Sequence, residues 1–303
     1  MHLLSWLLLP LLAAPALPEP KKSPRLEAAV REGLDEAVKK LASEKWSKDV
    51  IAVTLIDLKD PEKPEIGEHR GDAPYYPAST VKMLYMGATY QWVKDGRVKI
   101  DAAYQKDLEL MIGPSDNLAT QRVVDRLAGT QDGPALEGKA YAEFADKRNA
   151  VNRWLQGLGL KSLNACQKTY NGDEISPRDY QFLRGGKSSG PFTNRNRMTS
   201  HDAARFLMAI ATDKLVDAAS CDKMRALMAR KLPDHEKWIL GGAPAGSKAW
   251  SKPGWVATER HDAAIVELPG GRKLVLAIFT QGRSYEGTLI PEIAKSVLAR
   301  LDR

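Results

Sequence analysis

The pattern of hydrophobic positions predicts a helix and a strand near the start of the chain. The run VIAVTLIDL (50–58) is rich in β-branched residues and predicts a buried strand. Before it, Ser23-Pro24 suits a serine cap followed by a proline in the first helical turn. Apolar residues then recur at the spacing of an amphipathic helix: Leu26, Val30, Leu34, Val38 and Leu41.

The other end of the chain combines the same kinds of element. The stretch DAAIVELPGGRKLVLAIFTQG (262–282) holds two apolar runs separated by Pro-Gly-Gly, which predicts an antiparallel hairpin. The chain closes with TLIPEIAKSVLARLDR, which predicts a second amphipathic helix. Its apolar face consists of Leu289, Ile293, Val297 and Leu301.

Helical spacing dominates from about residue 80 to about residue 240. It is visible in STVKMLYMGATYQWVKDG, DNLATQRVVDRLAG, AYAEFADKRNAVNRWLQGLG and SHDAARFLMAIATD. Strands from both ends and helices from the middle predict an α/β (α+β) protein. We expect residues 25–78 and 245–303 to form an antiparallel sheet with flanking helices, and residues 79–244 to form an inserted all-helical subdomain. A cleft between two such parts is a natural place for a site.

Composition and charge narrow the classes of partner. The chain has 303 residues, 43% hydrophobic and 27% charged, with a net charge of +7, as is typical of a globular protein. Its basic residues are interleaved with acidic ones, and no nucleic-acid motif or basic stripe with regular aromatics is present. We therefore expect no nucleic-acid partner, and a surface that attracts anionic substrates or an anionic cell envelope.

The first residues predict export. Residues 3–17 form an apolar stretch broken by two prolines, which is short for a membrane span and ends in Ala14-Pro15-Ala16, a cleavage pattern. We expect residues 1–16 to be a signal peptide, the protein to be periplasmic or secreted, and no membrane span to remain after cleavage. An uncleaved anchor is the alternative, because the n-region has His2 but no Lys or Arg.

Export affects the interpretation of the two cysteines. In an oxidising compartment Cys166 and Cys221 are candidates for a disulfide, with two free thiols as the alternative. Neither cysteine has an adjacent histidine, and the five histidines show no ligand spacing. The sequence therefore predicts neither a metal site nor a cofactor.

The segment YPASTVK carries candidate chemistry. Ser79 and Lys82 lie at positions i and i+3 of a predicted helix, hence on one face, where a lysine can activate a serine nucleophile. The pair alone is a weak signal, because Ser220 and Lys223 have the same spacing in an ordinary helical context.

Two further motifs follow this pair along the chain. Ser115 to Asn117 form an SDN segment just before a helix, with plain helix capping as the alternative. Lys252 to Gly254 form a KPG segment ahead of the C-terminal hairpin, with a solvated turn as the alternative. No SDN segment follows Ser220, so both motifs support only the first pair.

The order S-x-x-K, S-D-N, K-x-G resembles the motif set of class A β-lactamases and penicillin-binding proteins, in which the third motif is K-T-G. The resemblance covers most of residues 25–303, including the closing hairpin. It implies a β-lactamase/transpeptidase-like fold. In that fold a five-stranded antiparallel sheet has helices on both sides, and Ser79 lies where the sheet meets a helical subdomain.

The resemblance also implies roles for the matching residues. Ser79 would attack a carbonyl and form an acyl-enzyme, with Lys82 as its base and Ser115 as the relay that protonates the leaving nitrogen. The backbone amides of Ser79 and Trp255 would form the oxyanion hole. Substrate-binding roles would fall to Asn117 for the acyl side chain, to Lys252 with Arg260 or Arg283 for a carboxylate, and to Gly254 and Trp255 beside them.

A free lysine is charged at neutral pH, so Lys82 can act as a base only where its pKa is lowered. Burial and a second cation nearby, Lys252, would both favour the neutral amine. The sequence therefore predicts that these two lysines lie close together in a buried site.

The sequence departs from the family pattern in three places. Pro253 replaces the hydroxyl residue of the third motif, and the first two motifs are closer together than in the usual class A enzyme, which suggests a trimmed helical subdomain. The Glu-x-x-Leu-Asn segment, whose glutamate activates the deacylating water, is missing: Leu160 stands three residues ahead of Leu163-Asn164. Glu174 is the candidate replacement, with an exposed loop acid as the alternative.

Three functions remain open on this basis. They are a serine hydrolase that acylates and turns over β-lactams, a D-amino-acid peptidase or esterase acting on cell-wall or other acyl compounds, and a non-catalytic β-lactam- or peptidoglycan-binding domain. Ser79, Lys82 and Ser115 together favour an enzyme, whereas the missing glutamate argues against fast turnover. We expect a monomer whose partner is a small β-lactam or acyl-peptide substrate.

Overall fold

The structure, a computed structural model, describes residues 16–42, 45–171, 174–282 and 285–301. Its centre is one sheet with the strand order β1-β3-β2-β8-β7-β5-β4, and β6 pairs with β7 beside β5. Neighbouring strands are antiparallel except β1 and β3. The strands are β1 (Lys21–Lys22), β2 (Ile51–Asp57), β3 (Glu65–His69), β4 (Ala229–Arg230), β5 (Lys248–Ser251), β6 (Gly254–Trp255), β7 (Glu259–Glu267) and β8 (Lys273–Gln281).

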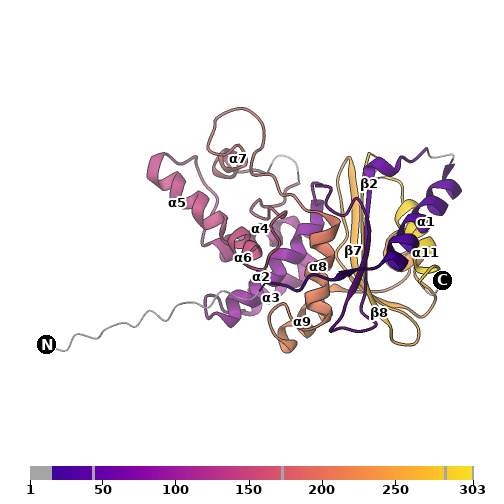
Figure 1. The fold of residues 1–303 in the computed structure, drawn as a ribbon. Coiled ribbons are helices and arrows are strands. Elements are labelled where there is room, and N and C mark those ends of the chain that lie inside the picture. Colours follow the sequence, from indigo (N-terminus) through magenta and orange to yellow (C-terminus); the bar gives the residue numbers. More distant parts are fainter. Residues whose placement is uncertain (1–15, 43–44, 172–173, 283–284, 302–303) are drawn as a thin grey trace.

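The described helices lie on both sides of this sheet (Figure 1). They are α1 (Pro24–Lys40), α2 (Lys82–Lys94), α3 (Ala102–Ile112), α4 (Asn117–Ala128), α5 (Gly138–Arg148), α6 (Ala150–Gly157), α7 (Pro177–Leu183), α8 (Ser200–Ala211), α9 (Ala218–Met228), α10 (Ile239–Gly242) and α11 (Leu289–Leu298), with the 3-10 helices η2 (Lys48–Val50) and η3 (Ala78–Val81). The predicted fold class is confirmed, and β1, β4 and β6, with two residues each, extend the expected five strands.

Strand β2 shows why its sequence is apolar at nearly every position. Successive side chains of a strand point to opposite faces of the sheet. Ala52 and Ile56 belong to the core shared with the helical layer, whereas Val53 and Leu55 belong to the core under α1 and α11. Both faces of the strand are therefore buried, and the predicted strand, hairpin and terminal helices are all confirmed.

The serine expected to cap α1 acts differently. Ser23 occupies the N-cap position, but its side chain makes no capping bond. Its hydroxyl instead donates to the Glu65 carboxylate at 3.3 Å. The helix start was correctly predicted, and the serine links it to β3.

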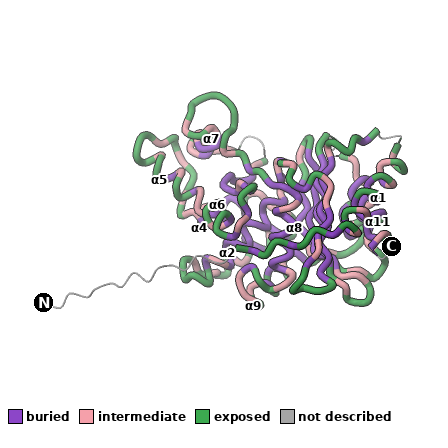
Figure 2. Tube along the Cα trace, in the orientation of Figure 1, coloured by how far each residue is buried: buried purple, intermediate pink, exposed green. Residues whose placement is uncertain are grey.

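Helix α8 packs on the sheet face opposite α1 and α11, and α2 lies buried among the remaining helices. Figure 2 shows that α5 and the loop beside α7 carry exposed residues at the far end of this layer. Two elements within residues 79–244 belong to the sheet side, because β4 pairs with β5 and α10 packs on α11. The regular elements of the inserted segment are therefore helices, apart from β4 in the stretch that leads back to the sheet.

The predicted signal peptide, residues 1–16, lies outside the described residues except for Ala16, so its cleavage stays a prediction. Within the described part of the chain, no helix combines the length and the apolar character needed to cross a membrane.

The suggested disulfide is absent, because both cysteines are free. Cys166 packs with Phe144 and Phe182 in a small cluster, whereas Cys221 lies on α9 in the main core of the helical layer. Burial raises the pKa of the Cys166 thiol to about 11, which makes it a poor nucleophile. A thiol is apolar enough to be buried alone, so two cysteines in one chain need not pair.

Candidate active site

Ser79 lies in the turn η3, where the sheet meets the helical layer. Ala78, directly before it, has a φ of 47°, a left-handed conformation that residues other than glycine rarely adopt. Gly254 of β6 packs against this turn, because a Cβ added there would lie 2.8 Å from the backbone nitrogen of Ser79 and 2.6 Å from that of Thr80. Only a glycine fits at this position, which accounts for the last residue of the KPG motif.

A buried histidine ties the segment before Ser79 to the sheet. The backbone N–H of Thr280 on β8 donates to His261 Nδ1 at 3.1 Å. Because Nδ1 accepts, the proton is on Nε2, which lies 2.9 Å from the Tyr76 carbonyl and donates to it. Burial lowers the pKa of His261 to about 4, so the neutral ring spans β8, β7 and the residues before Ser79 at neutral pH.

Lys82 is the first residue of α2 and is fully buried. Its Nζ donates to the Ser115 carbonyl at 2.6 Å, to Ser115 Oγ at 3.2 Å and to Asn117 Oδ1 at 2.8 Å. Burial lowers the pKa of Lys82 to about 7, although the Asp116 carboxylate opposes this change. This shift brings formation of the neutral amine toward neutral pH, which favours the form that a general base requires.

Ser115 bridges two lysines. Lys252, between β5 and β6, donates from Nζ to Ser115 Oγ at 3.0 Å and to the Pro253 carbonyl at 2.8 Å. Burial lowers the pKa of Lys252 well below its usual value, and the nearby charges of Lys82 and Arg230 add to this effect. The charge of Lys82 therefore favours loss of the proton from Lys252, whereas burial alone lowers the pKa of Lys82. The predicted closeness of the two lysines is found.

The SDN segment caps helix α4 and also accepts hydrogen bonds from the two lysines. Asp116 caps α4, where its Oδ1 accepts from the Ala119 N–H at 2.6 Å. Ser115 has a φ of 66°, a second left-handed residue in the site. Asn117 accepts from Lys82 through Oδ1 and donates from Nδ2 to the Tyr170 carbonyl at 3.2 Å and to Asn171 Oδ1.

Sequence reasoning missed Tyr170 and Asn171, which lie in an irregular segment without a recognisable period. In the sequence, Leu160 stands at the position of the missing glutamate, three residues before Leu163-Asn164. Leu160 is buried in the helical core, and Asn164 pairs with the backbone of Arg197.

Glu174 is exposed. Within the described residues, no carboxylate side chain hydrogen bonds to Lys82, Ser115 or Lys252. In the same part of the chain, no hydrogen bond joins Ser79 Oγ to Lys82 Nζ. The described groups that face the lysines are therefore amide, carbonyl and hydroxyl oxygens.

Trp255 and Arg260 belong to a stack at the sheet edge. The Trp255 ring, 55% exposed, lies 5.6 Å from the ring of Trp238, and the Arg260 guanidinium is 3.9 Å from the same Trp238 ring. Gly254 faces Ser79, so the next side chain along β6 points to the opposite face of the strand. Substrate contacts by these two side chains stay a prediction, and Arg283 lies outside the described residues.

A family profile described as the β-lactamase enzyme family matches residues 103–301. The match contains Ser115, Asn117 and Lys252 and begins after Ser79 and Lys82. It extends over more than half of the chain, so the protein belongs to the β-lactamase enzyme family. Among curated proteins, none matches the sequence.

Solved structures show the same fold at low sequence identity. A β-lactamase from Sphaerobacter thermophilus is 21% identical, with a TM-score of 0.64 over 89% of this chain and 97% of its own. The L158E mutant of PBP-A, an acyl-enzyme complex with penicillin G, is 19% identical, with a TM-score of 0.64 over 93% and 98%. The TLA-1 extended-spectrum β-lactamase is 16% identical, with a TM-score of 0.64 over 89% and 100%.

Proposed function

We propose that the protein is an exported serine hydrolase that forms an acyl-enzyme on Ser79, with β-lactams among its substrates. The observation that carries the proposal is the pair of buried lysines around Ser115 Oγ, in which the pKa of Lys82 is lowered to about 7. A lysine held in this way supplies the base that a serine hydroxyl needs.

The proposed acylation moves one proton along three residues. Lys82 takes the proton of Ser79 Oγ as this oxygen attacks the substrate carbonyl, and hydrogen bonds of this kind often tighten only when substrate is bound. The amides of Ser79 and Trp255 stabilise the oxyanion. As the carbon–nitrogen bond breaks, Ser115 gives its proton to the leaving nitrogen and regains one from Lys82.

Release of the acyl group needs a base for water, and the lysine cluster has no carboxylate partner within the described residues. This observation favours slow release, with Glu174 as the candidate acid/base. PBP-A L158E is recorded as an acyl-enzyme with penicillin G, and penicillin G is therefore a suitable first probe for this protein.

A second candidate is a D-amino-acid peptidase or an esterase of the same fold. Pro253 favours it, because a proline offers no hydroxyl to a substrate carboxylate, and its carbonyl already accepts from Lys252. An acyl substrate without a carboxylate would lose no hydrogen bond through the proline at position 253.

The test is incubation with penicillin G, with intact mass and hydrolysed product followed over time. A stable adduct on Ser79 supports acylation with slow release, and fast product without adduct supports a β-lactamase. Ser79→Ala should remove both signals, whereas Ser220→Ala, in the unsupported S-x-x-K match, should change neither. Wild type without adduct or product would exclude β-lactam acylation.

Export is tested separately. Expression of the full chain in a Gram-negative host and N-terminal sequencing of the periplasmic protein should give Leu17 as the first residue. Recovery of intact protein in the membrane fraction would instead indicate an anchor.

A further inference from the structure

Residues 166–171 form a segment that we call the arm. It has no regular secondary structure, yet side chains from elsewhere in the chain hold it in place. The Cys166 carbonyl accepts from Arg148 at 2.9 Å and 3.1 Å, the Gln167 carbonyl from Tyr85 at 2.6 Å and Asn196 at 3.0 Å, the Thr169 carbonyl from Gln121 at 3.1 Å and the Tyr170 carbonyl from Asn117 at 3.2 Å. These bonds satisfy backbone groups that would otherwise be buried without partners.

One face of α4 contacts the arm almost residue by residue. Asn117, Gln121 and Asp125 are four positions apart, which places them on a single stripe of the helix. Asn117 bonds to Tyr170 and Asn171, Gln121 to Thr169, and Asp125 to Lys168. The first of these helix residues also binds Lys82, so the stripe connects the arm with the active site.

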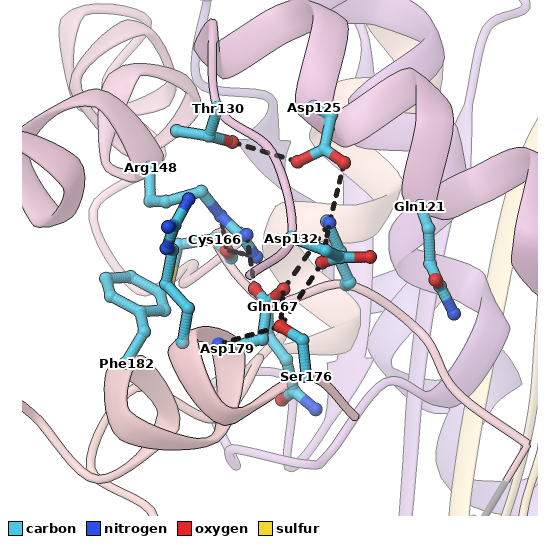
Figure 3. Close-up of polar contacts among 12 residues, drawn as sticks. Gln121, Asp125, Thr130, Asp132, Arg148, Cys166, Gln167, Ser176, Asp179 and Phe182 are labelled. Atoms are coloured by element: carbon cyan, nitrogen blue, oxygen red, sulfur yellow. Dashed lines mark hydrogen bonds and ion pairs between the residues drawn. The ribbon is translucent and has the colours of Figure 1, made fainter. Parts of the chain in front are cut away.

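The arm is anchored by an ion cluster around Lys168, whose side chain is 0% exposed, with Asp179 also buried and Asp132 about half exposed. Its Nζ lies 2.6 Å from Asp125, 2.6 Å from Asp132 and 3.4 Å from Asp179. Arg148 binds Asp179 at 2.5 Å, and Figure 3 shows these carboxylates converging from α4, α7 and the loop between α4 and α5. Removal of one partner from such a cluster leaves buried charge uncompensated.

We propose that Lys168 is a positioning residue for Lys82, because it fixes the arm that orients the Asn117 amide. This inference rests on the proposed role of Lys82 as the base. An asparagine amide presents one oxygen and one NH₂ group. When the arm takes the NH₂ group through the Tyr170 carbonyl, the oxygen must face Lys82.

Displacement of the arm would change the surroundings of Lys82. The charged groups near it are Asp116 and Lys252, and its neutral partners are Ser115 and Asn117. Without the arm, water reaches Nζ and Asn117 is free to rotate. The pKa of Lys82 then rises toward the usual lysine value, and less neutral amine remains at pH 7.

The test compares wild type with Lys168→Met by two measurements. NMR of protein labelled with ¹³C-lysine follows the Lys82 Cε signal, assigned with Lys82→Arg, as the pH changes. Acylation by penicillin is measured over the same pH range. We expect the Lys82 midpoint to rise by at least about one pH unit in Lys168→Met, with acylation at pH 7 at least about fivefold slower. An unchanged midpoint in the folded variant overturns the proposal.

Arg272→Met is the matched control. It removes one cation from another ion cluster, in which Arg272 and Arg25 both bind the buried carboxylate of Asp57. This variant should lose stability without moving the Lys82 midpoint, and an equal shift in both variants overturns the proposal.

If Lys168→Met does not fold, the double variant Lys168→Met/Asp132→Asn is measured instead, because loss of the Asp132 charge reduces the repulsion among the remaining carboxylates. The NMR result is independent of activity. If the Lys82 midpoint shifts in Lys168→Met but penicillin acylates neither protein, the positioning role of Lys168 is supported and the proposed function is rejected.

Discussion

Lys82 and Lys168 are both completely buried, yet their surroundings are opposite. Neutral oxygens from Ser115 and Asn117 surround Lys82, and a second lysine stands on the other side of the Ser115 hydroxyl. Three carboxylates surround Lys168. The chain thus buries one lysine without a carboxylate partner and another with three.

The difference shows how a buried lysine can be assigned a role. Burial of an ammonium group is unfavourable, and a protein can respond by pairing the charge or by lowering the pKa. A paired lysine joins segments of the chain, whereas an unpaired one exchanges its proton near neutral pH and becomes a candidate for catalysis. The partners of the side chain, rather than its burial, separate the two cases.

The sharpest test of this comparison is Lys82→Arg. Arginine keeps its proton at all accessible pH values, so it cannot accept one from Ser79. We expect acylation by penicillin to fall about 1,000-fold or more, measured by stopped-flow or mass spectrometry. Lys223→Arg, in the unsupported motif, should retain wild-type acylation, and a Lys82→Arg enzyme within tenfold of wild type would show that another group is the base.

The second test concerns stability. Lys168→Met leaves three carboxylates facing one another and should lower the free energy of unfolding by about 3–5 kcal/mol, measured by urea denaturation. Lys82→Met removes an amine without a carboxylate partner and leaves neutral oxygens unpaired, so it should lower this free energy by less, about 1–3 kcal/mol. Equal losses in both variants would contradict the distinction drawn between the two lysines.

The third test is the pH dependence of acylation. Only the deprotonated Lys82 is a base, and burial lowers its pKa to about 7. The rate should therefore rise about tenfold per pH unit below pH 7 and level off above it. A lower limb centred near pH 4 to 5 would point to a carboxylate base instead.

The smallest expected effect is that of Asp116→Asn. The Asp116 carboxylate raises the pKa of Lys82, against the effect of burial. An asparagine can still cap α4, so the fold should be retained while the midpoint of acylation moves to lower pH by a few tenths of a unit. A shift to higher pH in a rate profile of the folded variant would contradict this electrostatic account.

The fold could be predicted from sequence because its elements have strong local signals. The apolar run of β2, the hairpin of β7 and β8, and the amphipathic α1 and α11 are all read from consecutive residues. The lysine site was found through the order of three motifs, and their capping and turn alternatives could not be separated from function by local pattern alone.

The remaining contacts depend on residues far apart in sequence. Asp125 and Asp132 lie 43 and 36 residues from Lys168, and the arm between them and α7 has no periodicity. The same limit explains why Asn171 was missed and why a disulfide was considered. No rule of spacing shows whether two distant side chains meet.

The free thiols of Cys166 and Cys221 have a consequence for how the chain is made. With no cross-link to form, folding requires neither an oxidant nor a disulfide isomerase. The same native state is accessible in a reducing cytosol and in an oxidising envelope. Apart from the export test, recombinant protein from either compartment should therefore be interchangeable in the experiments above.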